Sequence, residues 1–255
     1  MNCIEDGWMR KVGIMSMQRI ANYGSFLQAY ALKQLIEEVG CNVEFVDYHV
    51  GAPVITENAD SKNKVVRKIE KGLETFRYRA PLAHKLSFIR YKQSFAQKYM
   101  PLLGIADEMN YNPTVDCLVI GSDEVFNCIQ KNSNVGYSPE LFGKNNHAKK
   151  LITYAASFGN TTLEKLEKYK KANEVGALLK KFDAISVRDA NSGTIVEQLT
   201  GKEPVYNLDP VLTYDYMNCC DKIPQVQTNE KYLILYAYAG RISNDEADWI
   251  AVYAK

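Results

Sequence analysis

The 255-residue sequence lacks several patterns that mark particular chemistries, and each absence excludes a class of protein. Its six cysteines include no Cys-x-x-Cys pair, which argues against a zinc knuckle or a dithiol redox site and favours reduced thiols. The three histidines, His49, His84 and His147, have no motif-like surroundings, so a hydrolase with a Ser-His or Cys-His pair is disfavoured. No apolar run reaches the ~18–20 residues of a transmembrane helix.

The sequence also lacks an excess of either charge. Lys and Arg number 31 and Asp and Glu 30, for a net charge of +1, which argues against a nucleic-acid partner. Met1–Trp8 lacks the basic start and apolar core of a secretory signal. The 46% hydrophobic and 24% charged residues are typical of a globular protein. We therefore expect a cytoplasmic globular protein with no metal site and no cofactor.

Short apolar runs alternate with longer segments of helical periodicity, which predicts an α/β fold with a mostly parallel sheet and flanking helices. The chain opens with a strand at 12–17, a helix at 25–39 that ends before Gly40, and a strand at 43–48. Further strands are expected at 117–120, 151–156, 184–187, 205–208 and 232–237, and further helices at 163–181 and 192–199. In such a sheet, ligands bind at the carboxyl ends of the strands.

Composition divides the chain into segments. We expect an N-terminal extension at 1–9, a Rossmann-like domain at 10–229, and the start of a truncated second domain at 230–255. Residues 61–100 form a basic helical insertion with eleven Lys or Arg and two acidic residues, a net charge of +9. Two interpretations stay open: the insertion contacts an anionic partner such as lipid headgroups, or it is a solvated helical pair that packs its aromatic residues on the sheet.

Small and polar residues follow four of the expected strands. After the first strand come Asn22-Tyr23-Gly24-Ser25 and Gln28, which form either an anion site at a helix N-terminus or a polar cap. After 117–120 come Ser122 and Asp123, where Asp123 is either a general base or a helix cap. Ser157 follows 151–156. Arg188 follows 184–187 and either clamps a carboxylate or phosphate or anchors the next helix.

With these residues in view, the chain resembles the polysaccharide pyruvyl transferase family over most of residues 10–215. The resemblance rests on five signatures in order: Asn22-Tyr23-Gly24-Ser25-x-x-Gln28-Ala29, Gly121-Ser122-Asp123, Tyr154-Ala155-Ala156-Ser157-Phe158-Gly159, Ile185-Ser186-Val187-Arg188-Asp189 and Asp209-Pro210. Where the family pattern has Gln-Val-Trp after Gly-Ser-Asp, this chain has Glu124-Val125-Phe126, so we expect different acceptor contacts.

The resemblance implies transfer of a pyruvate group from phosphoenolpyruvate to two hydroxyls of a sugar, giving a cyclic ketal and phosphate. The acceptor would belong to a bacterial polysaccharide or its lipid-linked precursor, which places the protein at the inner face of the membrane. The implied architecture is the N-terminal half of a two-domain, glycosyltransferase-like (GT-B-like) fold. Position by position, Asp123 and Arg188 would be catalytic, and the substrate-binding residues would be Asn22, Tyr23, Gly24, Ser25, Gln28, Ser122 and Ser157.

The family's second domain carries an arginine–histidine signature that no part of this sequence matches, so we expect the chain alone to be inactive. Two other functions stay open. A nucleotide-sugar glycosyltransferase of the same architecture would bind a nucleoside-diphosphate sugar instead of phosphoenolpyruvate. A non-catalytic carbohydrate- or anion-binding domain would use the same cleft without turnover.

Overall fold

The computed structural model describes residues 4–5, 8–52, 82–130, 135–217, 219, 231–235 and 242–254. The chain divides into two compact units, Met1–Tyr214 and Asp215–Lys255. Each unit is described by itself below.

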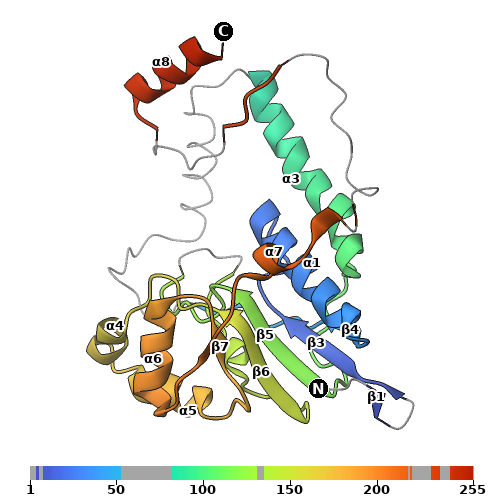
Figure 1. The fold of residues 1–255 in the computed structure, drawn as a ribbon, viewed down its shortest axis with the longest axis vertical. Coiled ribbons are helices and arrows are strands. Elements are labelled where there is room, and N and C mark those ends of the chain that lie inside the picture. Colours follow the sequence, from blue (N-terminus) through green and yellow to red (C-terminus); the bar gives the residue numbers. More distant parts are fainter. Residues whose placement is uncertain are drawn as a thin grey trace. The chain divides into compact units, whose positions relative to one another are not determined.

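The first unit is built on a six-stranded parallel sheet (Figure 1). Its order is β4-β3-β5-β6-β7-β8, in which β3 is Lys11–Met15, β4 Asn42–Phe45, β5 Cys117–Asp123, β6 Lys150–Ala156, β7 Ser186–Val187 and β8 Val205–Tyr206. The chain steps outward from β3 to β4 and then returns past β3 to β5, so the direction of winding changes between β3 and β5. The predicted parallel α/β fold is confirmed, and this point is where such sheets bind ligands.

Helices α1 (Tyr23–Glu38) and α3 (Leu82–Leu103) share one apolar cluster with one face of the sheet, and they lie side by side in Figure 1. Val12, Ile14 and Val119 point into this cluster because alternate residues of a strand face the same side. Phe95 of α3 is fully buried there. The short helix α7 (Pro210–Thr213) packs on α1 as well.

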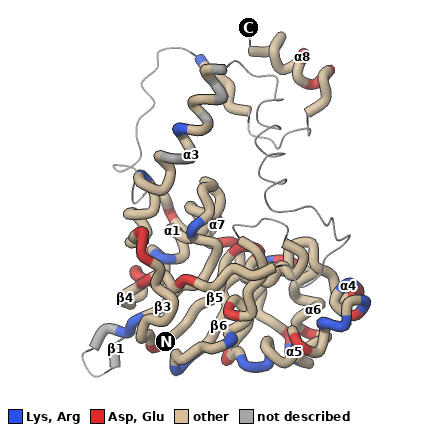
Figure 2. Tube along the Cα trace, turned by 180° about the vertical axis from the view of Figure 1, so that it is seen from behind, with Lys and Arg blue, Asp and Glu red and all other residues tan. Residues whose placement is uncertain are grey.

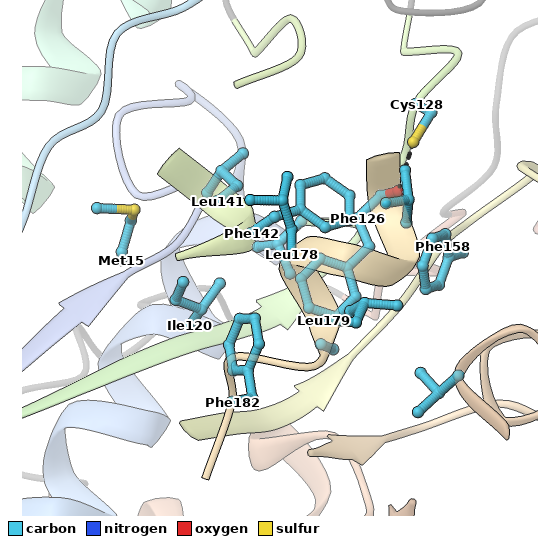
Figure 3. Packing of buried hydrophobic residues seen from close by; sticks show 14 of the residues in the cluster. Met15, Ile120, Phe126, Cys128, Leu141, Phe142, Phe158, Leu178, Leu179 and Phe182 are labelled. Atoms are coloured by element: carbon cyan, nitrogen blue, oxygen red, sulfur yellow. Dashed lines mark hydrogen bonds between the residues drawn. The ribbon is translucent and has the colours of Figure 1, made fainter. Parts of the chain in front are cut away.

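The other face packs against a 3₁₀ turn, η1 (Pro139–Phe142), and against α4 (Leu163–Lys168), α5 (Ala172–Leu179) and α6 (Ala190–Thr200). Phe126 lies at the centre of this cluster, with its ring 4.7 Å from Phe142 and 5.2 Å from Phe158 (Figure 3). The aromatic cluster therefore packs beneath the loops that follow β5 and β6. The outer side of α4 carries alternating acidic and basic residues (Figure 2).

Several details differ from the sequence expectations. The helix expected at 163–181 is two helices, because Lys170 adopts φ 58° and ends the first. Residues 232–235 of the strand expected at 232–237 are not in a strand. Cys41 is disulfide-bonded, so the expectation of reduced thiols is wrong there.

The two ends of the chain have local structure of their own. The expected extension contains a small antiparallel pair, β1 (Ile4–Glu5) with β2 (Trp8–Met9). In the second unit, α8 (Asn244–Tyr253) begins with a capping box between Ser243 and Glu246. Of the expected basic insertion, residues 61–81 lie outside the described residues, whereas 82–100 belong to α3. No helix in the described ranges has both the length and the apolar character needed to cross a membrane.

Candidate active site

A buried hydrogen-bond network joins α1 to the carboxyl ends of β3 and β5. The Oγ of Ser16 donates to the carbonyl oxygen of Ser122 (3.1 Å) and accepts from Nε2 of Gln28 (3.0 Å). The Oγ of Ser122 in turn donates to Oε1 of Gln28 (2.6 Å). All three side chains are at most 3% exposed. The first turn of α1 is therefore fixed against the end of β5.

Asn22 caps α1. Its Oδ1 accepts hydrogen bonds from the backbone N–H of Gly24 (2.7 Å) and of Ser25 (3.3 Å). Of the two interpretations of this loop, the cap is thus present, and it occupies two of the amides that an anion would use. The positive end of the α1 dipole still points toward the carboxyl edge of the sheet.

A row of charged side chains lies above this network. The Nη1 of Arg188 donates to Oδ2 of Asp209 (2.5 Å), and its Nη2 donates to Oδ1 of Asp123 (3.3 Å). The Oγ of Ser25 donates to the other oxygen of Asp123 (3.3 Å). The three charged side chains are 22–25% exposed. They are therefore held in place and still reachable from solvent.

The backbone at the end of β5 is unusual. Gly121 has φ 129°, and a Cβ there would lie 2.2 Å from the carbonyl oxygen of Tyr154. Asp123 follows with φ 79°, a region that non-glycine residues rarely adopt. Strained backbone of this kind is concentrated at functional sites, and here it turns the Asp123 carboxylate toward Arg188.

Ser157 supports the same turn from the neighbouring strand. Its backbone N–H donates to the carbonyl of Asp123 (3.0 Å), and its carbonyl accepts from the N–H of Phe126 (3.0 Å). Its Oγ accepts from the N–H of Gly159 (2.9 Å), and the residue is 4% exposed. Ser157 thus fixes the loop after β6 to the loop after β5.

Tyr23 lies apart from the charged row. Its ring packs against three aromatic rings of α3, those of Tyr91, Phe95 and Tyr99, at centroid distances of 5.4–5.5 Å. Its hydroxyl is 3.4 Å from that of Tyr99, and this contact raises the pKa of Tyr99. With 46% of its surface exposed, Tyr23 borders the site from the α3 side.

Phe126 occupies a position where the sequence departs from the family pattern, and it is fully buried in the core. The Phe126 side chain therefore has no exposed surface in this unit, and the change in acceptor contacts stays a prediction. Glu124 remains partly exposed and accepts a hydrogen bond from Nδ2 of Asn127 (2.8 Å).

Tyr48 is a neighbour of the site that the sequence did not indicate. It is 8% exposed and donates to the carbonyl of Val135 (3.3 Å). Burial, with a smaller contribution from the charge of Asp123, raises the pKa of Tyr48 to about 12. Ser16 is a second such residue: the sequence places it inside the strand expected at 12–17, whereas in the structure it follows β3 and bonds Ser122.

The structure thus brings Ser25, Asp123 and Arg188 together at one edge, with Gln28 and Ser122 beneath them. In the described ranges, no group of three or more His, Cys, Asp or Glu side chains is placed to hold a metal ion.

One of three comparisons with known proteins finds a match. No curated protein and no solved structure matches the chain. A family model described as polysaccharide pyruvyl transferase matches residues 22–254, a range that begins at the α1 cap and includes the whole charged row. The resemblance inferred from the five signatures is confirmed, and the chain belongs to the polysaccharide pyruvyl transferase family.

Proposed function

We propose that this protein transfers the pyruvate group of phosphoenolpyruvate to two hydroxyls of a sugar in a bacterial polysaccharide or its lipid-linked precursor. The observation that carries the proposal is the position of Arg188, held between Asp123 and Asp209 beside the N-terminal end of α1. The reaction would take place in the cytoplasm, at the inner face of the membrane where the acceptor is lipid-linked. A second Rossmann-like domain would complete a GT-B-like cleft over this edge.

Arg188 is the group suited to the donor. Phosphoenolpyruvate carries a phosphate and a carboxylate, and a guanidinium binds either one through two parallel hydrogen bonds. Of the two contacts that Arg188 makes, the one with Asp123 is the longer, at 3.3 Å against 2.5 Å. The donor anion would therefore replace Asp123 and leave Arg188 positioned by Asp209.

Asp123, once released, is the candidate base for the acceptor. Its carboxylate keeps hydrogen bonds from Ser25 Oγ and from the backbone N–H of Glu124 (2.9 Å), which orient it at the open edge. In the proposed reaction, a proton adds to the methylene carbon of phosphoenolpyruvate and one sugar hydroxyl adds to its C2 while losing a proton to Asp123. The C2–O bond to phosphate then breaks, the second hydroxyl takes its place, and its proton passes to the departing phosphate. No water is consumed or released.

Donor binding is the direct test. We expect isothermal titration calorimetry to detect phosphoenolpyruvate binding, and Arg188→Gln to weaken it about ten- to a hundredfold, because charge-assisted hydrogen bonds are lost. Arg188→Lys keeps the charge but not the paired geometry, so its affinity should fall between the two. Lys202→Gln, which removes one exposed positive charge at the end of α6, is the matched control.

Equal affinity for phosphoenolpyruvate in all four proteins would refute the role of Arg188. Binding of a nucleoside diphosphate instead of phosphoenolpyruvate would support the glycosyltransferase alternative.

Turnover is tested separately. Phosphate release and the mass of the product are measured with phosphoenolpyruvate and a methyl hexopyranoside that has free 4- and 6-hydroxyls, a pair suited to a six-membered ketal. Asp123→Asn should remove turnover while phosphoenolpyruvate still binds. The turnover test uses a protein that includes the arginine–histidine domain. Donor binding without turnover in that protein would support the non-catalytic alternative.

A further inference from the structure

A pocket of about 310 Å³ lies on the face of the sheet opposite α1. Its floor is apolar and consists of Met15 on β3, Val46 just after β4, and Leu118 on β5. These side chains belong to the cluster that also contains η1 and α5, not to the cluster of α1 and α3. The pocket is therefore separate from the charged row, although Met15 directly precedes Ser16.

Two irregular segments form its walls, residues 111–115 before β5 and residues 144–148 before β6. The first wall is anchored through Arg19, which donates to both oxygens of Asp47 (2.6 and 2.7 Å) and to the carbonyls of Ala106 (2.9 Å) and Glu108 (3.0 Å). The N–H of Asn110 donates to Asp47 as well (2.8 Å). This wall is thus fixed to the end of β4 without any ligand.

His49 joins the first wall to η1. Glu140 lines the pocket and accepts from the backbone N–H of His49 (2.8 Å), and its carboxylate lies 3.0 Å from Nδ1 of the same residue. The His49 ring stacks on Tyr111, with centroids 4.0 Å apart and planes at 10°. The aromatic ring at the pocket is therefore held in a defined orientation.

Polar side chains around the pocket have unused hydrogen-bonding capacity. Within the described part of the chain, no hydrogen bond or ion pair engages the side chains of Asn112, Lys144, Asn145 or His147, all four of which line the pocket. Asn146 differs, because its amide is used within its own loop by Ala148. The pocket thus combines an apolar floor, one fixed aromatic ring and several free amide, amino and imidazole groups.

We propose that this pocket binds an uncharged pyranose residue. A pyranose presents apolar C–H groups on its faces and hydroxyls around its edge, which suits an apolar floor with polar groups on the walls. The volume lies at the low end of the ~300–1,000 Å³ of small-molecule sites, so one sugar is accommodated more readily than a larger ligand. An anion is disfavoured because no arginine lines the pocket and the carboxylate of Glu140 offsets the positive charge of Lys144. The assignment rests on the proposed function in one respect: it takes the bound sugar and the acceptor sugar to be residues of the same polysaccharide.

Saturation-transfer NMR with glucose, galactose, mannose and N-acetylglucosamine, recorded without phosphoenolpyruvate, tests the site. We expect at least one of these sugars to bind, and Asn112→Ala to weaken it about five- to tenfold through loss of a hydrogen bond. Thr114→Trp, at another exposed lining residue, should remove binding by filling the pocket. Gln198→Ala, at an exposed amide on α6, is the matched control and should leave binding unchanged.

The outcomes separate this proposal from the transfer reaction. Arg188→Gln should weaken phosphoenolpyruvate binding and leave the sugar signals unchanged. The pocket assignment would be overturned if no sugar bound, or if the Asn112 and Thr114 variants bound sugar as well as the unaltered protein does. Neither result would affect the donor site. Loss of the sugar signals in Arg188→Gln would place the sugar at the charged row and would overturn the pocket assignment too.

Discussion

The Oγ of Ser122 donates a hydrogen bond of 2.6 Å to Oε1 of Gln28, across the point where the sheet changes its direction of winding. Gln28 is 3% exposed, and its Nε2 also donates to Ser16 Oγ and to the carbonyl of Ser25 (2.9 Å). One side chain therefore joins β3, β5 and α1. Gln28 thus fixes the elements that carry the charged row.

We predict that Gln28→Ala lowers the free energy of unfolding by about 2–4 kcal/mol, because it leaves the buried Ser122 hydroxyl without its acceptor and removes the donor to Ser16 Oγ. Gln34→Ala is the matched control, since Gln34 lies on the same helix and, among the described residues, its side chain bonds only Glu37 near the surface; its cost should be at most about 0.5 kcal/mol. Urea denaturation measures both. Similar losses for the two variants would show that the network contributes little.

Gly121 gives a second prediction. Gly121 and Gly40 both have positive φ, at 129° and 85°, but a Cβ at Gly121 would meet the Tyr154 carbonyl at 2.2 Å, whereas a Cβ at Gly40 would meet nothing within 4 Å. Gly40→Ala should therefore cost about 1 kcal/mol from backbone strain alone. Gly121→Ala should cost at least ~2 kcal/mol more because a strand must move. Equal thermal stability of the two variants would contradict this account of the turn.

The six strands of the sheet and helices α1 and α6 could be predicted from apolar periodicity, because alternating faces and helical stripes are local properties of the sequence. The break between α4 and α5 could not be predicted, because the apolar pattern continues through it. The break is visible only in the backbone, where Lys170 has a positive φ. Likewise, Tyr232–Leu235 is as apolar as a buried strand but does not pair. Strand formation needs a partner that a single run of sequence does not specify.

Part of the site could be predicted from the order of the strands. Ser25, Asp123 and Arg188 were identified because each follows a strand, and parallel strands end at one edge. That Gln28 and Ser122 bond each other in the interior depends on side-chain direction, which sequence spacing does not give. The pocket at Tyr111 was missed altogether because its walls are irregular segments with no periodic pattern.

Asp183 provides a pH-dependent prediction. Its carboxylate accepts from the backbone N–H of Leu151 (2.9 Å) and from Nζ of Lys150 (2.9 Å), which lowers its pKa from the usual 3.8. A native pKa below the unfolded value stabilises the fold above pH ~3.8, and this contribution is lost as the pH falls through the lower native value. We therefore expect Asp183→Asn to lower the urea midpoint at neutral pH and to reduce its fall in acid. Glu203→Gln, at an exposed carboxylate, should leave the acid profile unchanged, and an unchanged profile in Asp183→Asn would refute the assignment.

Tyr23 allows a structural role to be separated from a binding role. Its ring packs on Tyr91, Phe95 and Tyr99 of α3, whereas its hydroxyl contacts only that of Tyr99 among the described residues. Tyr23→Ala should therefore cost about 1–3 kcal/mol and speed hydrogen exchange in α3, since a partly exposed aromatic cluster loses one ring. Tyr23→Phe keeps the ring and should cost less than about 1 kcal/mol.

The phenylalanine variant carries the functional test of Tyr23. If the Tyr23 hydroxyl contacts substrate, Tyr23→Phe weakens acceptor binding while hydrogen exchange in α3 stays at the level of the unaltered protein. Tyr99→Phe is the matched control, because it removes the other hydroxyl of the same 3.4 Å contact and leaves every ring in place. Equal acceptor affinity in all three proteins would assign Tyr23 to the packing of α3 on α1 and remove it from the substrate-binding residues.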